Sequence, residues 1–99
     1  MSKKVFIVLQ DSNIDGEHFI NTTPCKDLET AKQVMDICVN DLLKEGVYEG
    51  LDLDQIEKDQ EDDEADCDYY LKRDETNFLL GRVYDDYSEV IRIIEKEIV

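Results

Sequence analysis

The sequence predicts an α+β fold, an antiparallel sheet of four to five strands with one amphipathic helix packed on one face, in the order β-β-α-β-β. Two observations point to this fold. Strand-like apolar patterns lie towards both ends of the chain, and one long helical pattern lies between them. At 99 residues, the chain has room for a single domain, which we place at residues 1–99.

The first expected element is a hairpin. Lys4–Leu9 (KVFIVL) is β-branched and apolar almost throughout, which is typical of a central strand buried on both faces. The polar run Gln10–Gly16 follows, and its last two residues, Asp-Gly, favour the positive φ angles of a tight turn. Glu17–Thr23 predicts the returning strand, which Pro24 ends.

A helix is expected next, beginning after Asp27, whose carboxylate can accept hydrogen bonds from the free amides of the first turn. Lys44 suits the negative end of the helix dipole, and Gly46 is expected to end the helix in the left-handed conformation. Apolar residues recur at three- and four-residue steps and predict one buried face: Leu28, Ala31, Met35, Cys38 and Leu42.

Residues 47–68 are the most acidic part of the chain. They hold eleven Asp and Glu against one Lys, a net charge of −10 out of −15 for the whole chain. Leu51, Leu53 and Ile56 could anchor a short helical turn, but Gln55–Asp68 contains almost nothing to bury. Because such dense charge resists burial, we expect this acidic segment to be a solvated loop or a frayed helix.

Two or three more strands are expected in the last third. Tyr69–Leu71 and Phe78–Leu80 predict strands on either side of a turn at Asp74–Asn77, and Gly81 is expected to mark a bulge or bend.

The C-terminal segment Glu89–Val99 is open to two interpretations. Its high content of Ile and Val favours a strand, which we adopt, because these side chains are stiff at χ1. A helix is the alternative, since a heptad pattern includes Tyr84, Tyr87, Ile91, Ile94 and Ile98.

Composition limits the functional classes. No apolar run approaches the roughly 20 residues of a membrane-spanning helix, and the N-terminal pattern is that of a strand rather than a signal peptide. Three cysteines without CxxC or CxxH spacing fit reduced thiols, so a cytoplasmic protein is expected. A net charge of −15 argues against direct binding of nucleic acid or of an anionic membrane, whose phosphates it would repel.

The sequence gives no support to an enzyme or a cofactor site. It contains no GxGxxG, GxxxxGK[ST] or HExxH motif. Its one histidine, His18, has no cysteine near it in sequence, which argues against zinc and against a Cys–His nucleophile. We therefore expect a non-enzymatic protein without a cofactor.

One motif keeps a metal alternative open. Residues 11–16 (DSNIDG) match the opening D-x-[DN]-x-[DN]-G of a calcium loop, in which oxygens of alternate residues, here Asp11, Asn13 and Asp15, converge on the ion. Thr22 stands where the closing Glu of such a loop belongs, and strands are expected on both sides. An ordinary polar hairpin turn is favoured, and a calcium- or metal-responsive module is the alternative.

Both ends of the chain and the first helix resemble a loose group of short, uncharacterised bacterial and phage proteins. The resemblance rests on the opening strand Lys4–Val8, the Asp15-Gly16 turn, the helix entry Asp27–Lys32 and the closing strand Ile91–Ile98. It implies the same α+β fold. It does not extend to the acidic segment, and it brings no activity with it.

The acidic segment has two functional interpretations. One is a solvated loop that keeps the protein soluble and has no specific ligand. The other is a polyanionic surface that mimics nucleic acid. Eleven carboxylates on 22 residues, if helical, give one charge per roughly 3 Å, about half the density of duplex DNA. Further carboxylates elsewhere could add to this surface: Asp85, Asp86 and Glu89.

The function predicted from the sequence is therefore that of an acidic interaction protein that binds a basic protein surface. A phage or mobile-element inhibitor of a nucleic-acid-binding protein would be one such protein. The expected partner-binding residues are Glu57, Asp59, Glu61, Asp62, Asp63, Glu64, Asp66 and Asp68.

Overall fold

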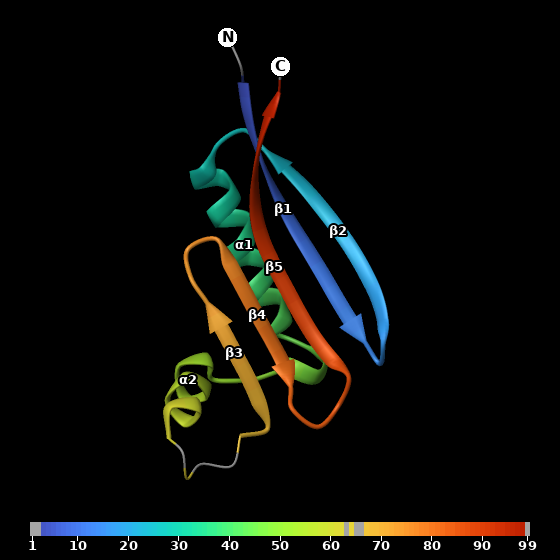
Figure 1. Cartoon of the computed structure of the whole chain (residues 1–99), viewed down its shortest axis with the longest axis vertical. Coiled ribbons are helices and arrows are strands. Elements are labelled where there is room, and N and C mark those ends of the chain that lie inside the picture. Colours follow the sequence, from blue (N-terminus) through green and yellow to red (C-terminus); the bar gives the residue numbers. More distant parts are fainter. Residues whose placement is uncertain (1–2, 63, 65–66, 99) are drawn as a thin grey trace.

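A five-stranded antiparallel sheet and two α-helices make up the computed structural model, which describes residues 3–62, 64 and 67–98 (Figure 1). The elements in chain order are β1 (Lys3–Ile14), β2 (Glu17–Cys25), α1 (Leu28–Leu42), the short 3-10 helix η1 (Gly46–Tyr48), α2 (Leu53–Glu61), β3 (Tyr69–Arg73), β4 (Asn77–Arg82) and β5 (Tyr87–Ile98). The predicted α+β class and antiparallel sheet are confirmed. The order differs from the predicted one by a second helix and a fifth strand.

The strand order is β2-β1-β5-β4-β3, so the first and last strands of the chain lie next to each other in the middle of the sheet. They pair along their whole length, from Lys3 opposite Ile98 to Ile14 opposite Tyr87. The C-terminal segment is therefore a strand, as predicted. The helical alternative is wrong, because this segment fills the gap between the hairpin β1–β2 and the hairpin β3–β4 (Figure 1).

The predicted turn of the first hairpin is too long. Only Asp15 and Gly16 form it, with φ angles of 53° and 89°, and residues 10–14 continue β1. Both positive φ angles match a two-residue turn whose twist fits a hairpin. The polar residues stay in the strand because β2 and β5 pair with β1 on either side up to Ile14.

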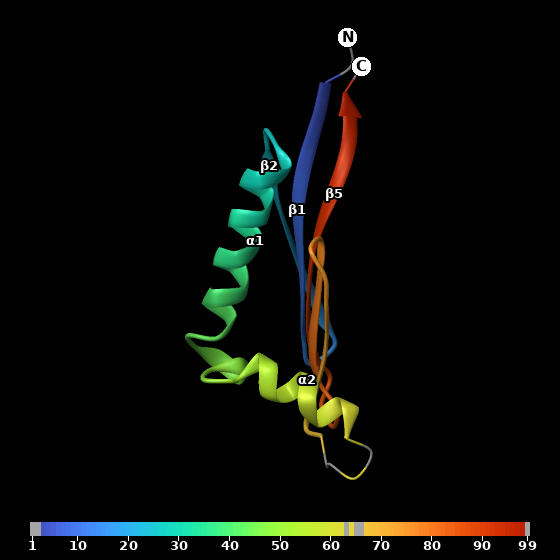
Figure 2. The same cartoon turned by 90° about the vertical axis from the view of Figure 1, so that its left-hand side faces the viewer.

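Only one face of the sheet is covered by α1, and the other face has no helix on it (Figure 2). The prediction that the first strand is buried on both faces is therefore wrong. Of its side chains only Val8, on the covered face, is buried, with 2% of its surface exposed. The core lies between α1, η1 and the covered face, and its largest fully buried side chains are those of Val8, Leu80 and Ile91.

Helix α1 begins as predicted and ends earlier. The backbone N–H of Thr30 donates to the Asp27 carboxylate at 2.7 Å, which lowers the pKa of Asp27 and caps the helix. Ala31 and Met35 are buried against the sheet. The helix stops at Leu42, and Gly46, with a φ of 84°, begins η1 instead of ending α1.

The first half of the acidic segment forms a helix, so the expected solvated loop is wrong there, whereas the expected anchoring of a helical turn by Leu53 and Ile56 is confirmed. Asp52 caps α2 by accepting the Gln55 backbone N–H at 3.2 Å, and the helix buries Leu53 and Ile56. The two buried apolar side chains and the capping carboxylate help to hold the helix beside β3. Neither α1 nor α2, nor any other helix in the described residues, is long and apolar enough to cross a membrane.

Gly81 does not mark a bulge. The register runs through it without interruption, with Tyr70 opposite it on β3 and Ser88 opposite it on β5. The ring of Tyr70 occupies the space that a side chain at position 81 would need. Glycine is required here by this close approach and not by a bend in the strand.

Candidate protein-interaction surfaces

The predicted partner-binding residues lie on α2 and in the segment that follows it. Glu57, Asp59 and Glu61 belong to α2. Asp62, Glu64 and Asp68 follow the helix and are exposed, whereas Asp63 and Asp66 lie outside the described residues. We call the described carboxylates of this region the acidic surface: Asp54, Glu57, Asp59, Glu61, Asp62, Glu64 and Asp68.

One of the predicted residues is not free to meet a partner's cation. The guanidinium of Arg73, on β3, donates to Glu57 through Nε at 3.0 Å and through Nη2, and Nη2 also donates to Asp54 at 2.7 Å. The hydrogen bond to Glu57 is the main cause of the raised pKa of Arg73. These two carboxylates therefore share one internal positive charge and hold α2 against β3.

The other carboxylates of the acidic surface are bound less tightly or not at all. Asp59 accepts a hydrogen bond from the Gln55 side chain at 2.9 Å, and Asp62 accepts the Glu64 backbone N–H at 3.0 Å. Glu61 and the side chain of Asp68 are exposed and make no ion pair with a described residue. Most of the predicted negative charge therefore faces solvent.

The carboxylates expected to extend this surface do not do so. Asp85 pairs with Arg82 at 2.6 Å, and Asp86 accepts a hydrogen bond from the Asn13 side chain at 2.7 Å. Glu89 is 6% exposed and lies on the covered face of the sheet. The sequence contained a signal for its burial, because Glu89 alternates in phase with Ile91 on a strand and so shares its face.

Burial of Glu89 creates a polar cluster beneath the sheet that the sequence analysis missed. The Ser12 hydroxyl donates to the Glu89 carboxylate at 2.8 Å, but burial still raises the pKa of Glu89. Tyr48 of η1 is buried nearby, and burial followed by the charge of Glu89 raises the pKa of its phenol. Among the described residues, the Tyr48 hydroxyl has no hydrogen-bond partner.

The residues of the calcium alternative make contacts of other kinds. Asp11 lies 2.9 Å from His18 Nδ1 across the hairpin. Asn13 binds Asp86 and also accepts the Gly16 backbone N–H at 3.0 Å, while Asp15 occupies the turn itself. Nowhere in residues 3–62, 64 and 67–98 do three or more His, Cys, Asp or Glu side chains group in a way that could hold a metal ion.

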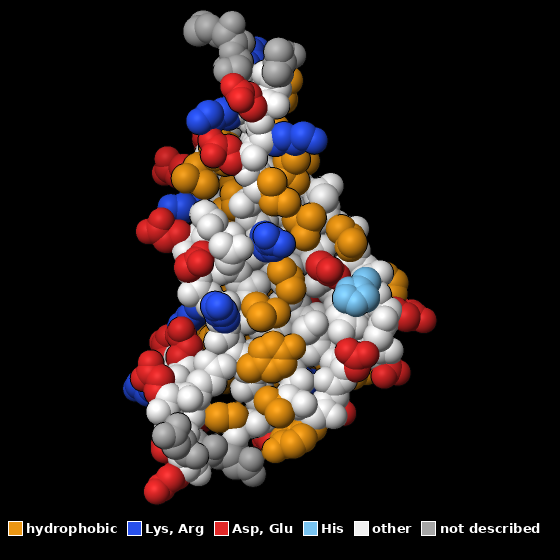
Figure 3. All heavy atoms as spheres, viewed as in Figure 1, with side chains coloured by type: hydrophobic (Ala, Val, Ile, Leu, Met, Phe, Trp, Pro, Cys, Tyr) orange, Lys and Arg blue, Asp and Glu red, His pale blue; other side chains and the backbone are white. Residues whose placement is uncertain are grey.

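The uncovered face of the sheet, here called the open face, differs in charge from the rest of the protein. Strand alternation places four Lys or Arg on it (Lys3, Lys72, Arg92 and Lys96) and one acidic residue, Asp11. Figure 3 shows hydrophobic side chains gathered in a band across this face, with most of the acidic side chains along its margins. The negative charge of the chain is therefore concentrated elsewhere.

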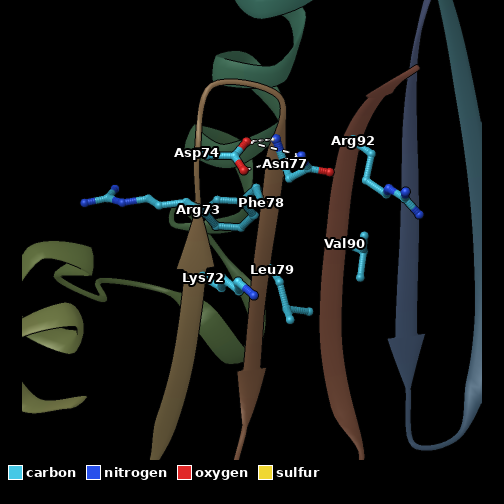
Figure 4. Close-up of a pocket in the computed structure, with 8 residues that line it drawn as sticks. All are labelled: Lys72, Arg73, Asp74, Asn77, Phe78, Leu79, Val90 and Arg92. Atoms are coloured by element: carbon cyan, nitrogen blue, oxygen red, sulfur yellow. Dashed lines mark hydrogen bonds between the residues drawn. The ribbon is translucent and has the colours of Figure 1, made fainter. Parts of the chain in front are cut away.

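A shallow hollow of about 370 Å³ lies on the open face (Figure 4). Leu79 and Val90 form its floor, and Lys72 and Arg92 lie on either side of it. Neither of these two cations makes an ion pair or hydrogen bond with a described residue. Arg73, by contrast, points away from the hollow towards α2 (Figure 4).

Ion pairs follow the same division between the two faces. The Lys and Arg residues that pair lie on the covered side of the sheet, on α1 or in the turn that follows α1: Lys4, Lys32, Lys44, Arg73 and Arg82. The protein thus neutralises part of its acidic side internally and leaves the cations of the open face free among the described residues.

Comparison of the chain with protein-family models, with curated proteins and with solved structures finds no match.

Proposed function

We propose that this chain is a non-enzymatic interaction protein whose acidic surface docks on a basic surface of another protein. The single observation that carries the proposal is the exposure of carboxylates on and after an ordered helix, with Arg73 as the only internal cation paired to them among the described residues. A field of this kind accelerates encounter with a positively charged groove and disfavours acidic partners.

The order of α2 favours binding. A disordered acidic loop would lose conformational entropy when it docks, whereas a helix held by Leu53, Ile56 and the Arg73 ion pairs has lost that entropy already. Helix α2 carries four carboxylates on nine residues, which at about 1.5 Å per residue gives one charge per roughly 3.4 Å, about half the charge density of duplex DNA. A groove that binds nucleic acid is the basic surface that this arrangement fits best.

The open face limits how far such mimicry extends. Its four cations and single acidic residue would be repelled by a basic groove. The proposed contact is therefore restricted to the acidic surface.

A neutralised variant and a matched control test the proposal. The variant carries Glu61→Gln, Glu64→Gln and Asp68→Asn, three exposed residues whose side chains make no ion pair with a described residue. The control carries Asp36→Asn, Glu45→Gln and Glu97→Gln, which are also exposed and which change the net charge by the same amount away from the acidic surface.

Each protein is immobilised and exposed to a heparin-retained protein fraction, which is enriched in proteins with basic grooves. Wild type and control should capture the same proteins, and both high salt and duplex DNA should release them. If each exposed charge pair contributes about 0.5 kcal/mol, the neutralised variant should bind roughly tenfold more weakly. Equal capture by the neutralised variant, or capture that duplex DNA does not reverse, contradicts the proposal.

A further inference from the structure

The two edges of the sheet differ in whether their outward-facing backbone groups are hydrogen-bonded to another part of the chain. At the β3 edge, the side chain of Gln60 on α2 makes the two hydrogen bonds that another strand would make. Its Nε2 donates to the Leu71 carbonyl at 2.9 Å, and its Oε1 accepts the Leu71 backbone N–H. A covered edge of this kind cannot add a further strand.

At the β2 edge, no described residue outside the sheet makes a comparable pair of hydrogen bonds. In a hairpin closed by a two-residue turn, the residues that flank the turn, Ile14 and Glu17, exchange backbone hydrogen bonds, and every second pair does the same. This alternation turns the backbone groups of His18, Ile20 and Thr22 away from β1. Pro24, which has no N–H, ends the free edge.

The side chains of β2 are exposed except for Cys25 at its end. Phe19 and Ile20, on opposite faces of the strand, are 51% and 62% exposed. Glu17 is the only Asp, Glu, Lys or Arg in the strand, although the chain has a net charge of −15. Natural edge strands are usually protected by charge, and this one carries a single charged residue and two exposed large apolar side chains.

We propose that β2 pairs antiparallel with β2 of a second copy of this chain, about a twofold axis that passes beside Ile20. The two sheets then form one continuous ten-stranded sheet. In this register Ile20 lies opposite Ile20 of the second copy, His18 lies opposite Thr22, and Phe19 lies opposite Asn21. The three outward-facing residues of each strand exchange about six hydrogen bonds.

The occupant is a second copy because this register is self-complementary. Glu17 lies opposite Thr23 and not opposite another carboxylate, and the two Ile20 side chains pack against each other on the open face. The acidic surface lies beside β3, four strands away from β2, which at about 4.8 Å per strand is roughly 19 Å. Salt screens charges at that distance, so two acidic copies can meet at their β2 edges.

Dimerisation therefore has the opposite salt dependence from the proposed docking. Two copies of net charge −15 repel each other, and raising the salt concentration weakens that repulsion. Sedimentation velocity should show a monomer–dimer equilibrium that shifts towards dimer as salt rises, whereas binding of a basic partner weakens. The dimer does not depend on the proposed function, and the failure of one leaves the other untouched.

Two isoleucines of equal exposure give a matched pair of variants. Ile20→Lys places two cations opposite each other at the centre of the interface and should abolish the dimer. Ile37→Lys alters an isoleucine on α1 that is 59% exposed and should leave the dimer as it is. Circular dichroism confirms that each variant is folded. A wild type that stays monomeric at high salt and high concentration overturns the proposal, as does an Ile20→Lys variant that still dimerises.

A cysteine variant tests the register directly. Hydrogen-bonded residues opposite each other on antiparallel strands have Cα atoms about 5.5 Å apart, within the range that a disulfide spans. Under mild oxidation Ile20→Cys should form a covalent dimer. Wild type measures how much covalent dimer the native Cys25, Cys38 and Cys67 form by themselves. Ile37→Cys measures how much one added exposed thiol contributes at any position. A cross-linked yield for Ile20→Cys no higher than that for Ile37→Cys overturns the twofold register.

Discussion

Arg73 and Glu57 join the second helix to the edge of the sheet: the guanidinium donates to one carboxylate oxygen of Glu57 through both Nε and Nη2. Asp54 accepts a further hydrogen bond from the same Nη2. Two carboxylates one helical turn apart repel each other unless a cation lies between them. Arg73 therefore allows an acidic sequence to form α2 where composition alone predicts a loop.

Replacing Arg73 with Ala should loosen α2 more than the loss of an isolated surface ion pair would. The pair is partly screened by solvent, so we expect a loss of about 1 kcal/mol in the free energy of unfolding. Urea denaturation measures this loss. Lys4→Ala is the control, because it removes a single pair with Glu95 whose side chains are both more than half exposed. Equal losses in the two variants would show that Arg73 does not anchor the helix.

Gln60→Ala should expose the β3 edge. The variant leaves the backbone N–H and carbonyl of Leu71 without their partners, at a cost of about 1–2 kcal/mol. Hydrogen exchange should become faster at the Leu71 amide in particular. Gln55→Ala, which removes an exposed side-chain hydrogen bond to Asp59 on the same helix, is the control and should leave that amide protected.

Gly81→Ala should destabilise the fold although the backbone conformation at Gly81 suits any residue. The added methyl group collides with the ring of Tyr70, and overpacking of this kind costs about 1–3 kcal/mol. The double variant Gly81→Ala, Tyr70→Ala should recover part of that loss, because the ring is gone. If the losses of unfolding free energy in the two single variants simply add in the double variant, the collision with the Tyr70 ring is not the cause of the loss in Gly81→Ala.

Ionisation of Glu89 should weaken the fold as the pH rises. Burial raises the pKa of Glu89 in the folded protein, so the folded state holds this proton at pH values where the unfolded chain has released it. The stabilisation is present below the unfolded pKa of about 4.3 and is lost as the pH rises through the folded pKa.

Glu89→Gln isolates this effect, because glutamine does not ionise and can still accept the Ser12 hydroxyl. The difference in unfolding free energy between the variant and wild type should increase with pH from about 4.3 upwards and then level off. Asp27 and Asp74, whose pKa values are lowered by hydrogen bonds, contribute equally to both proteins and cancel. A difference that does not change with pH would mean that Glu89 ionises as freely in the fold as in the unfolded chain.

The parts of the fold that the sequence predicted correctly depend on local pattern. The Asp27 cap, the apolar stripe through Ala31 and Met35, and the β-branched C-terminal strand are visible within short windows of sequence. The fold class, the antiparallel sheet and the first helix follow from these local patterns. The turn at Asp15-Gly16 is predicted at the correct position but with too many residues. Polar residues of a strand cannot be told from turn residues until the strands that pair with them are known.

The parts that the sequence did not predict depend on contacts between distant residues. Helix α2 is held by Arg73, which lies sixteen residues beyond Glu57, and no local window contains that pair. Glu89 is buried because of the face it occupies on a central strand, while its charge suggests exposure. The free cations of the open face become a group only when β3 and β5 are placed on either side of β4.

The placement of β5 between β1 and β4 also determines how the chain can fold. All strand pairing between the N-terminal hairpin and the β3–β4 hairpin passes through this last strand, so β5 must be synthesised before the sheet can be completed. Pairing residues as distant in sequence as Lys3 and Ile98 requires closing a long loop, which slows folding. A fragment that stops before Tyr87 would leave two hairpins without the strand that pairs with both of them.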